Sequence, residues 1–214
     1  MPRIKGASHQ ATSAATQERL VASTGHLLST VGFAQTTTRA IAERSGCNQA
    51  LISYHFGSLN QLLLAALDAS VDARLERYRH ELDAVSNGRQ LRRLARRLYR
   101  EDREAGHVRL LGEMVAGGLM DRELGRQVAQ RVRPWTTLVE DTIRRLLPQP
   151  LRRRVPVSQF AYGVVAGFVG LAIIGELFED HSQGDALLDR LATEPSVWKL
   201  LVSSNVPQRD EGNR

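Results

Sequence analysis

The chain has 214 residues, 42% of them hydrophobic, and a formal net charge of +6. This length allows one large or two small domains with a sizeable core, and the composition excludes a mainly disordered chain. The basic balance favours a polyanionic partner such as a nucleic acid.

The single cysteine and the first residues bear on the compartment. One cysteine, Cys47, excludes an intrachain disulfide framework and fits a reducing, cytoplasmic location. The first fifteen residues contain no apolar stretch of the kind found in signal peptides. We therefore interpret residues 1–13 as a flexible arm with two basic residues, Arg3 and Lys5, and the Cys47 thiol as a packed side chain.

Helical periodicity extends from Thr16 to Val202, and no segment alternates like a β-strand. The predicted class is therefore all-α. The first helix has a single apolar stripe and ends at Gly32. The stripe consists of Leu20, Val21, Thr24, Leu27, Leu28 and Val31.

The segment TRAIAERSGCNQALISYHFG, residues 38–57, has the pattern of a helix-turn-helix. Ile41 and Ile52 are expected in the core, and Gly46 is expected to take the positive φ of a tight turn. The second helix then exposes a short, polar and nearly uncharged face, which suits hydrogen bonds to base edges. That face comprises Asn48, Gln49, Ala50, Ser53 and Tyr54.

The residues of this face have different expected roles. Gln49 is the best candidate for direct base recognition, because its amide can pair with adenine through two hydrogen bonds. Asn48 opens the second helix, and both helix capping and base contact remain open for it. Tyr54 suits a phosphate contact or packing, and His55 is either close to DNA or simply half-buried.

The next helix is expected to begin at Ser58, where Ser58 and Gln61 have the spacing of a capping box. It should extend to about Ala84 and end before Asn87 and Gly88. A helix over residues 89–105 follows, with apolar residues on one face and arginines on the other. The arginines are Arg92, Arg93, Arg96, Arg97 and Arg100. We interpret this row as a solvated face, with phosphate binding as the alternative.

Downstream, Asp121 is a predicted N-cap, and its helix should reach about Leu147 with a kink at Pro134. A proline-rich connection then leads to a glycine-rich apolar helix and to a last helix from Gly184 to about Ser203.

The apolar stretch from Phe160 to Phe178 has a borderline length for a membrane span. We favour a helix in a soluble bundle or a dimer interface, because Glu176 interrupts the apolar run and amphipathic segments flank it. Four glycines in and beside the helix centre would allow two helix backbones to approach closely. These predicted dimer-interface residues are Gly163, Gly167, Gly170 and Gly175.

The chemistry of an enzyme cannot be assembled from this sequence. No two of the six histidines are three or four residues apart, and the lone cysteine gives no thiolate pair for zinc. A Gly-x-Ser-x-Gly elbow and a phosphate-binding loop are also absent. We therefore expect no catalytic activity, no cofactor and no metal. Glu113, isolated in an apolar segment, could contact a cationic ligand or simply face water.

The segment GFAQTTTRAIAERSGCNQALISYHFGS, residues 32–58, resembles the tetracycline-repressor (TetR) family of bacterial transcriptional regulators. The resemblance implies a three-helix DNA-binding domain at residues 14–74, with the motif at about 37–56. It also implies a larger helical domain for ligand binding and dimerisation at residues 75–205, about nine helices in all, and a flexible tail at 206–214.

The resemblance also assigns residues. Thr37 would cap the second helix, the residues from Asn48 to Ser53 would lie over the major groove, and Phe56 would pack in the core. The predicted DNA contacts are Arg3, Lys5, Thr37, Thr38, Arg39, Asn48, Gln49, Ala50, Ser53, Tyr54 and His55. Many family members have tyrosine in place of Ser53 and lysine in place of Leu59, so this chain departs from the pattern at both positions.

The predicted function is that of a homodimeric repressor that binds a palindromic DNA operator and is released by an unidentified small-molecule effector. Large apolar groups, together with Glu113, are the candidate pocket lining. They are Tyr99, Leu110, Glu113, Met114, Met120, Trp135 and Leu138. The alternatives are a helical scaffold that binds nucleic acid without sequence preference and a small-molecule carrier; no membrane association is expected.

Overall fold

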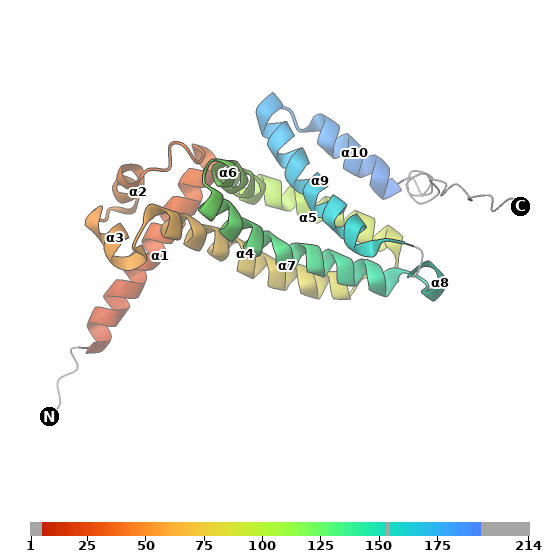
Figure 1. Ribbon diagram of the computed structural model, residues 1–214, viewed down its shortest axis with the longest axis horizontal. Helices are drawn as coiled ribbons and strands as arrows, with labels where there is room; N and C mark the ends of the chain where they lie inside the picture. The colour runs from red at the N-terminus through yellow and green to blue at the C-terminus, as the bar shows by residue number, and fades with distance from the viewer. Residues whose placement is uncertain (1–5, 153–154, 194–214) are drawn as a thin grey trace, which may run out of the picture.

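The computed structural model describes residues 6–152 and 155–193, and within these ranges the chain forms ten α-helices and no strand (Figure 1). The all-α prediction is confirmed. The helices are α1 (Gly6–Thr30), α2 (Thr38–Ser45), α3 (Ala50–Phe56), α4 (Leu59–Asp83), α5 (Gly88–Glu104), α6 (His107–Met120), α7 (Arg122–Leu146), the single turn α8 (Gln149–Arg152), α9 (Val157–Phe178) and α10 (Ser182–Thr193).

Helix α1 begins at Gly6, so most of the predicted arm is helical. The weakly apolar sequence of residues 6–15 gave no periodic signal there, but it contains alanines that favour a helix. The predicted stripe is confirmed at Leu20, Thr24 and Leu28, which are fully buried, but it is wrong at Val31, which is 48% exposed just after the helix ends. Arg3 and Lys5 lie outside the described residues, as do the predicted tail at 206–214 and the end of the last helix.

The helix-turn-helix has the predicted local geometry. The Thr37 hydroxyl accepts a hydrogen bond from the Ala40 amide and caps α2. Gly46 ends α2 with φ 62° and ψ 28°, the left-handed conformation that glycine adopts at little cost. Ile41 and Ile52 are 0% and 1% exposed. With Leu20 and Leu62, they form the N-terminal core on which α3 is held.

Helix α4 begins with the predicted cap, in which the Ser58 hydroxyl accepts from the Gln61 amide. Its first half contributes to a central core that α1, α4, α6 and α7 share. The buried members of this central core are Leu28, Leu63, Leu64, Ala66, Leu67, Val71, Leu110, Met114, Leu124 and Val128. Because Leu28 lies on α1, the N-terminal helices are packed directly onto the C-terminal bundle rather than linked by a flexible spacer.

Asp121 caps α7, as predicted, and Asn87, predicted only to end the preceding helix, caps α5. Helix α7 continues as one element through Pro134. Helices α6 and α7 cross closely, because a Cβ added to Gly118 would lie 2.8 Å from the Gly125 Cα atom. The glycine pair therefore permits a backbone contact that any side chain would obstruct.

Helix α9 packs on α7 and α6, and α10 packs on α5. Figure 1 shows α2 and α3 at one end of the molecule, with the long helices α4 and α7 extending away from them. Arg96 and Arg103 of α5 form ion pairs with Asp189 and Asp185 of α10. Part of the predicted solvated arginine face therefore binds α10.

Candidate nucleic-acid interface

Helix α3 turns one face to the core and one to solvent. Ile52 is buried, whereas Ala50, Ser53 and Tyr54 are exposed, and 79% of Tyr54 is accessible. A large aromatic side chain exposed to this degree gains little from packing in the isolated chain. A short helix that presents an exposed, mostly polar face at the end of the molecule has the geometry needed to enter a DNA groove.

Asn48 and Gln49 make local contacts before α3 begins. The Asn48 Oδ1 atom accepts a hydrogen bond from the Ala50 amide at 2.8 Å, so Asn48 caps the start of α3. The Gln49 Nε2 atom donates to the Thr38 hydroxyl at 2.6 Å and connects the two helices of the motif. Gln49 is exposed, and its second N–H remains for a base acceptor.

The residues that follow Tyr54 point back to the first helix. The His55 Nδ1 atom lies 3.5 Å from Gln17 Nε2 on α1, and the Tyr54 ring packs edge-on against the imidazole. Phe56 packs on the N-terminal core, as predicted. Leu59 packs on the same core, which explains why this chain has an apolar residue at that position.

Basic side chains near the motif include Arg39, which is exposed, and Arg19. The Arg19 guanidinium donates to the Cys47 Sγ atom at 3.4 Å, and Cys47 is partly buried on the N-terminal core. Cys47 is thus a packed thiol, as predicted.

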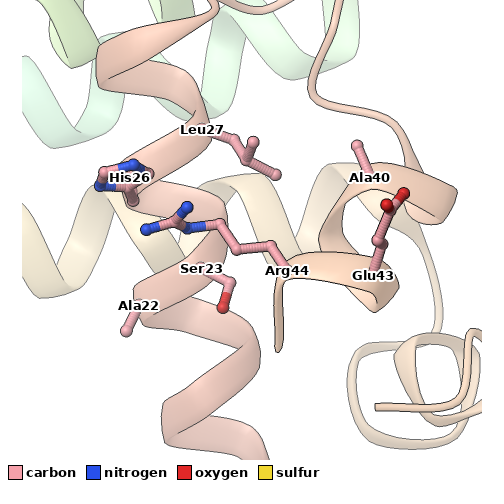
Figure 2. Close-up of a pocket in the computed structure, with 7 residues that line it drawn as sticks. All are labelled: Ala22, Ser23, His26, Leu27, Ala40, Glu43 and Arg44. Atoms are coloured by element: carbon pink, nitrogen blue, oxygen red, sulfur yellow. The ribbon is translucent and has the colours of Figure 1, made fainter. Parts of the chain in front are cut away.

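A shallow groove lies between α1 and α2 (Figure 2). Arg44 extends from α2 across the groove toward His26 and Ser23 of α1. The other lining residues are Ala22, Leu27, Ala40 and Glu43. None of the predicted DNA or ligand contacts lines this groove, so it does not extend the α3 surface.

Glu113 has a role that the sequence did not reveal. Its Oε2 atom accepts a hydrogen bond from the Phe33 amide at 2.7 Å, across the boundary between the N-terminal helices and α6. The Phe33 ring covers Gly117, since a Cβ added there would lie 2.3 Å from the ring. Gly32 has φ 88° and lies against the same carboxylate. Glu113 therefore anchors the α1–α2 loop to α6 rather than facing a cavity.

The other predicted pocket residues lie in different packing environments. Leu110 and Met114 belong to the central core, and Tyr99 packs edge-on against Phe168 of α9. Met120 is 90% exposed at the end of α6, so the prediction that it lines a pocket is wrong for this chain alone. Its apolar character suggested burial, but α6 ends there and none of the described helices covers it.

Trp135 and Leu138 lie farther along α7. They contact a distal core whose buried members are Tyr78, Leu82, Val85, Leu94, Leu98 and Leu138. Trp135 also packs against the central core, and so it bridges the two.

Helix α9 is long and apolar enough to cross a membrane, yet only 17% of its most apolar window is buried. Gly163, Gly167 and Gly170 have open space where a Cβ would be. Gly175 differs, because the His181 ring lies 2.1 Å from a Cβ built there. The intrachain packing of Gly175 removes it from the predicted interface. The exposed apolar side chains of α9 are Tyr162, Ile173, Ile174, Leu177 and Phe178.

Residues 20–66 match the family model of bacterial regulatory proteins of the tetR family. The N-terminal domain belongs to the tetR family. The match covers the second half of α1, the whole helix-turn-helix and the start of α4, the segments that position the exposed face of α3. A tetR-family domain carries DNA binding and transcriptional regulation.

The whole chain also has the fold of solved tetR-family structures. A transcriptional regulator from Rhodococcus sp. aligns with a TM-score of 0.68 and 20% identity, over 83% of this chain and 96% of that one. The fatty acid degradation regulator FadR from Bacillus halodurans aligns with a TM-score of 0.67 and 10% identity, over 88% and 95%. The multidrug binding protein EbrR, solved with imidazole, gives 0.57 and 20%, over 82% and 93%. No curated protein sequence matches the chain.

Proposed function

We propose that this protein is a cytoplasmic, non-enzymatic transcriptional repressor that binds a palindromic operator as a homodimer and is released by a small molecule. The observation that carries the proposal is the exposed face of α3, where Tyr54 is 79% accessible while Ile52 fixes the helix to the core. Gln49 and Ser53, which precede Tyr54 in the sequence, are exposed too. These side chains would contact bases and phosphates in the major groove.

The proposed dimer interface is α9. An apolar helix with so small a buried share would be costly in water, and a second copy of the same helix would cover it symmetrically. Gly163, Gly167 and Gly170 would let the two backbones approach, since no described residue lies within 4 Å of a Cβ built at any of them. Two copies would then present two α3 helices about 34–36 Å apart, one turn of DNA.

The proposed release follows from the packing of α4. Helix α4 is separated from α3 only by Gly57 and Ser58, and its first half belongs to both the N-terminal and the central cores. A displacement of α4 by a ligand would therefore move α3 and change the spacing of the two recognition helices. The similar structures include one named a multidrug binding protein, which supports a small-molecule effector.

Operator selection from random duplexes, followed by a salt series, tests DNA recognition. We expect one enriched palindrome, bound at least about 10³-fold more tightly than a scrambled duplex at the same salt concentration. The double variant Gln49→Ala/Tyr54→Ala should lose most of this ratio. Glu76→Ala, which removes an exposed side chain on α4, is the matched control and should keep it. Equal affinity of the wild-type protein for all duplexes would instead indicate a non-specific nucleic-acid scaffold.

Sedimentation of the wild-type protein and of Gly167→Leu tests the interface. The wild-type protein should sediment as a dimer without detergent, and Gly167→Leu should shift it toward monomer while the helical signal remains. Leu187→Ala, which truncates an exposed side chain on α10, is the control. A wild-type monomer that requires detergent for solubility would contradict the dimer and favour a membrane role for α9.

A further inference from the structure

A buried cationic side chain, Arg74 on α4, lies where α4, α5, α6 and α7 meet. Only 11% of the Arg74 side chain is exposed, and its Nε and Nη1 atoms have no hydrogen-bond partner among the described residues. The nearest carboxylate is Asp102 on α5, whose Oδ1 atom is 3.9 Å from the Arg74 Nε atom. This distance allows an ion pair but exceeds a hydrogen bond.

Aromatic and polar groups surround this guanidinium. The Arg74 Cζ atom is 5.7 Å from the ring centroid of Trp135, which packs edge-on against Tyr78. His107 Nδ1 and the Ser70 hydroxyl are 3.0 Å apart. Burial, and then the Arg74 charge, lower the pKa of His107, so the imidazole is neutral at pH 7. The site thus contains a guanidinium with two unpaired donor atoms beside the Asp102 carboxylate, an imidazole of lowered pKa and the Trp135 ring.

An arrangement of this kind is incomplete as it stands. A buried donor that makes no hydrogen bond costs free energy, and a buried guanidinium costs more than a neutral group. Folded proteins pair nearly all such donors with protein groups, ordered water or a ligand, so the Nε and Nη1 atoms of Arg74 offer two donors that a bound group can satisfy. A second cation, Arg77, lies nearby. It forms ion pairs with Glu81 and Glu101 at the surface, so it does not depend on Asp102 for a partner.

We propose that Arg74 binds the carboxylate of a small organic acid, and that the apolar part of this acid lies against Trp135. The unpaired Nε and Nη1 atoms of Arg74 are cationic donors, and each could give a charge-assisted hydrogen bond to a carboxylate oxygen. The Asp102 carboxylate, 3.9 Å from Arg74, would repel a dianion such as phosphate more than a monoanion. The Trp135 ring adds a contact for an aromatic or aliphatic body that phosphate lacks.

This inference rests on the proposed function, because the acid would be the effector that releases DNA. Arg74, Asp102, His107 and Trp135 come from four different helices. A bound acid would therefore tie the distal half of α4 to α5, α6 and α7. Because α4 leads back to α3, a shift of α4 at Arg74 would be transmitted to the recognition helices.

The test measures binding to the DNA-free, full-length protein by titration calorimetry. The probes are benzoate, phenylacetate, hexanoate and octanoate, with the corresponding neutral amides and inorganic phosphate as controls. We expect at least one acid to bind about ten-fold or more tightly than its amide and than phosphate. If no acid binds better than its amide, the proposal is overturned.

Variants then locate the site. Arg74→Met should weaken binding of the acid about ten-fold or more. Arg79→Met removes an exposed arginine of the same helix, which pairs with Glu76 at 3.6 Å, and should leave the affinity unchanged. Equal losses in the two variants, or no loss in Arg74→Met, would contradict a site at Arg74.

A second variant covers the case in which Arg74→Met does not fold. Asp102→Asn removes the competing negative charge and keeps a polar side chain of the same shape. It should tighten binding of the acid about three-fold or more, because the acid no longer faces a like charge. An unchanged or weaker affinity would contradict the proposal, since a merely structural Asp102 has no reason to oppose the acid.

The proposed regulator function and the proposed acid site at Arg74 can be contradicted independently of each other. Sequence-specific operator binding without an acid site would overturn the role of Arg74 and leave the regulator intact. An acid site in a protein that binds all duplexes equally would overturn the proposed function alone. If acid and operator both bind, the bound acid should lower operator affinity in the wild-type protein and not in Arg74→Met; unchanged operator affinity would overturn the effector role.

Discussion

The two halves of α4 differ sharply in what surrounds them. In the first half, Leu62, Leu63, Leu64 and Leu67 are at most 2% exposed and pack in the N-terminal and central cores. In the second half, Arg74 is buried with unpartnered donor atoms. Apolar packing makes the first half a rigid support for α3, whereas the second half retains unsatisfied polar groups that a ligand can complete. One helix can thus support α3 through its first half and bind a ligand through its second half.

Truncation of a leucine in the first half should have the largest effect. Leu67→Ala is expected to lower the free energy of unfolding by about 3 kcal/mol, because a fully buried side chain leaves a cavity in the central core. Leu75→Ala, in the partly buried second half, should cost less than half as much. Urea denaturation at one protein concentration gives both values. Equal losses would show that the two halves are equally well packed.

The contact between Glu113 and Phe33 should have the next effect, because it fixes the N-terminal helices to the bundle beside the first half of α4. Glu113→Ala leaves the Phe33 amide without its acceptor and should cost about 1–2 kcal/mol. Glu113→Gln keeps an acceptor and should cost less. Operator affinity should fall in the same order, since the recognition helices lose their fixed position. Unchanged operator affinity in Glu113→Ala would show that the contact between Glu113 and Phe33 does not contribute to DNA binding.

The ion pair at the middle of α4 should matter little. Arg131 of α7 donates two hydrogen bonds to Asp68, at 2.5 and 2.8 Å, but Asp68 is 42% exposed. Solvent screening therefore limits Asp68→Asn to a loss of less than about 1 kcal/mol, which high salt should reduce further. A loss comparable to that of Leu67→Ala would show that polar contacts stabilise the first half of α4 as much as apolar packing does.

The smallest expected effect is a pH dependence from the second half of α4 and its surroundings. Burial lowers the pKa of His107 below 6.5, so the unfolded chain binds a proton more readily than the folded one. Its contribution to stability is complete above pH 6.5 and decreases as the pH falls toward the lower folded value. The wild-type protein should therefore lose more stability between pH 7 and pH 5 than His107→Gln does. Parallel curves would contradict this.

The sequence predicted the local features well because short-range chemistry determines them. The turn at Gly46, the caps at Thr37, Ser58 and Asp121, and the buried Ile52 each depend on residues a few positions apart. The family model matches residues 20–66, which contain Thr37, Gly46, Ile52 and Ser58. The predicted DNA contacts remain predictions, and two of them lie outside the described residues.

The sequence could not predict contacts that join distant segments. Glu113 and Phe33 are 80 positions apart, and no periodicity relates an isolated glutamate to a backbone amide in a loop. Arg74 appears in the sequence as one more charge on an amphipathic helix, and only its burial among four helices distinguishes it from Arg79. Met120 illustrates the opposite error, because apolar character does not ensure burial at a helix end.

Operator spacing tests the central claim most directly, because it requires sequence recognition and a rigid dimer together. The measurement compares affinity for the selected palindrome with affinity for the same palindrome carrying five extra base pairs at its centre. Half a helical turn places the second half-site on the opposite face of the DNA. We predict that the insertion reduces affinity to the level of a scrambled duplex. Equal affinity for the two duplexes would contradict a homodimer that reads both half-sites through α3.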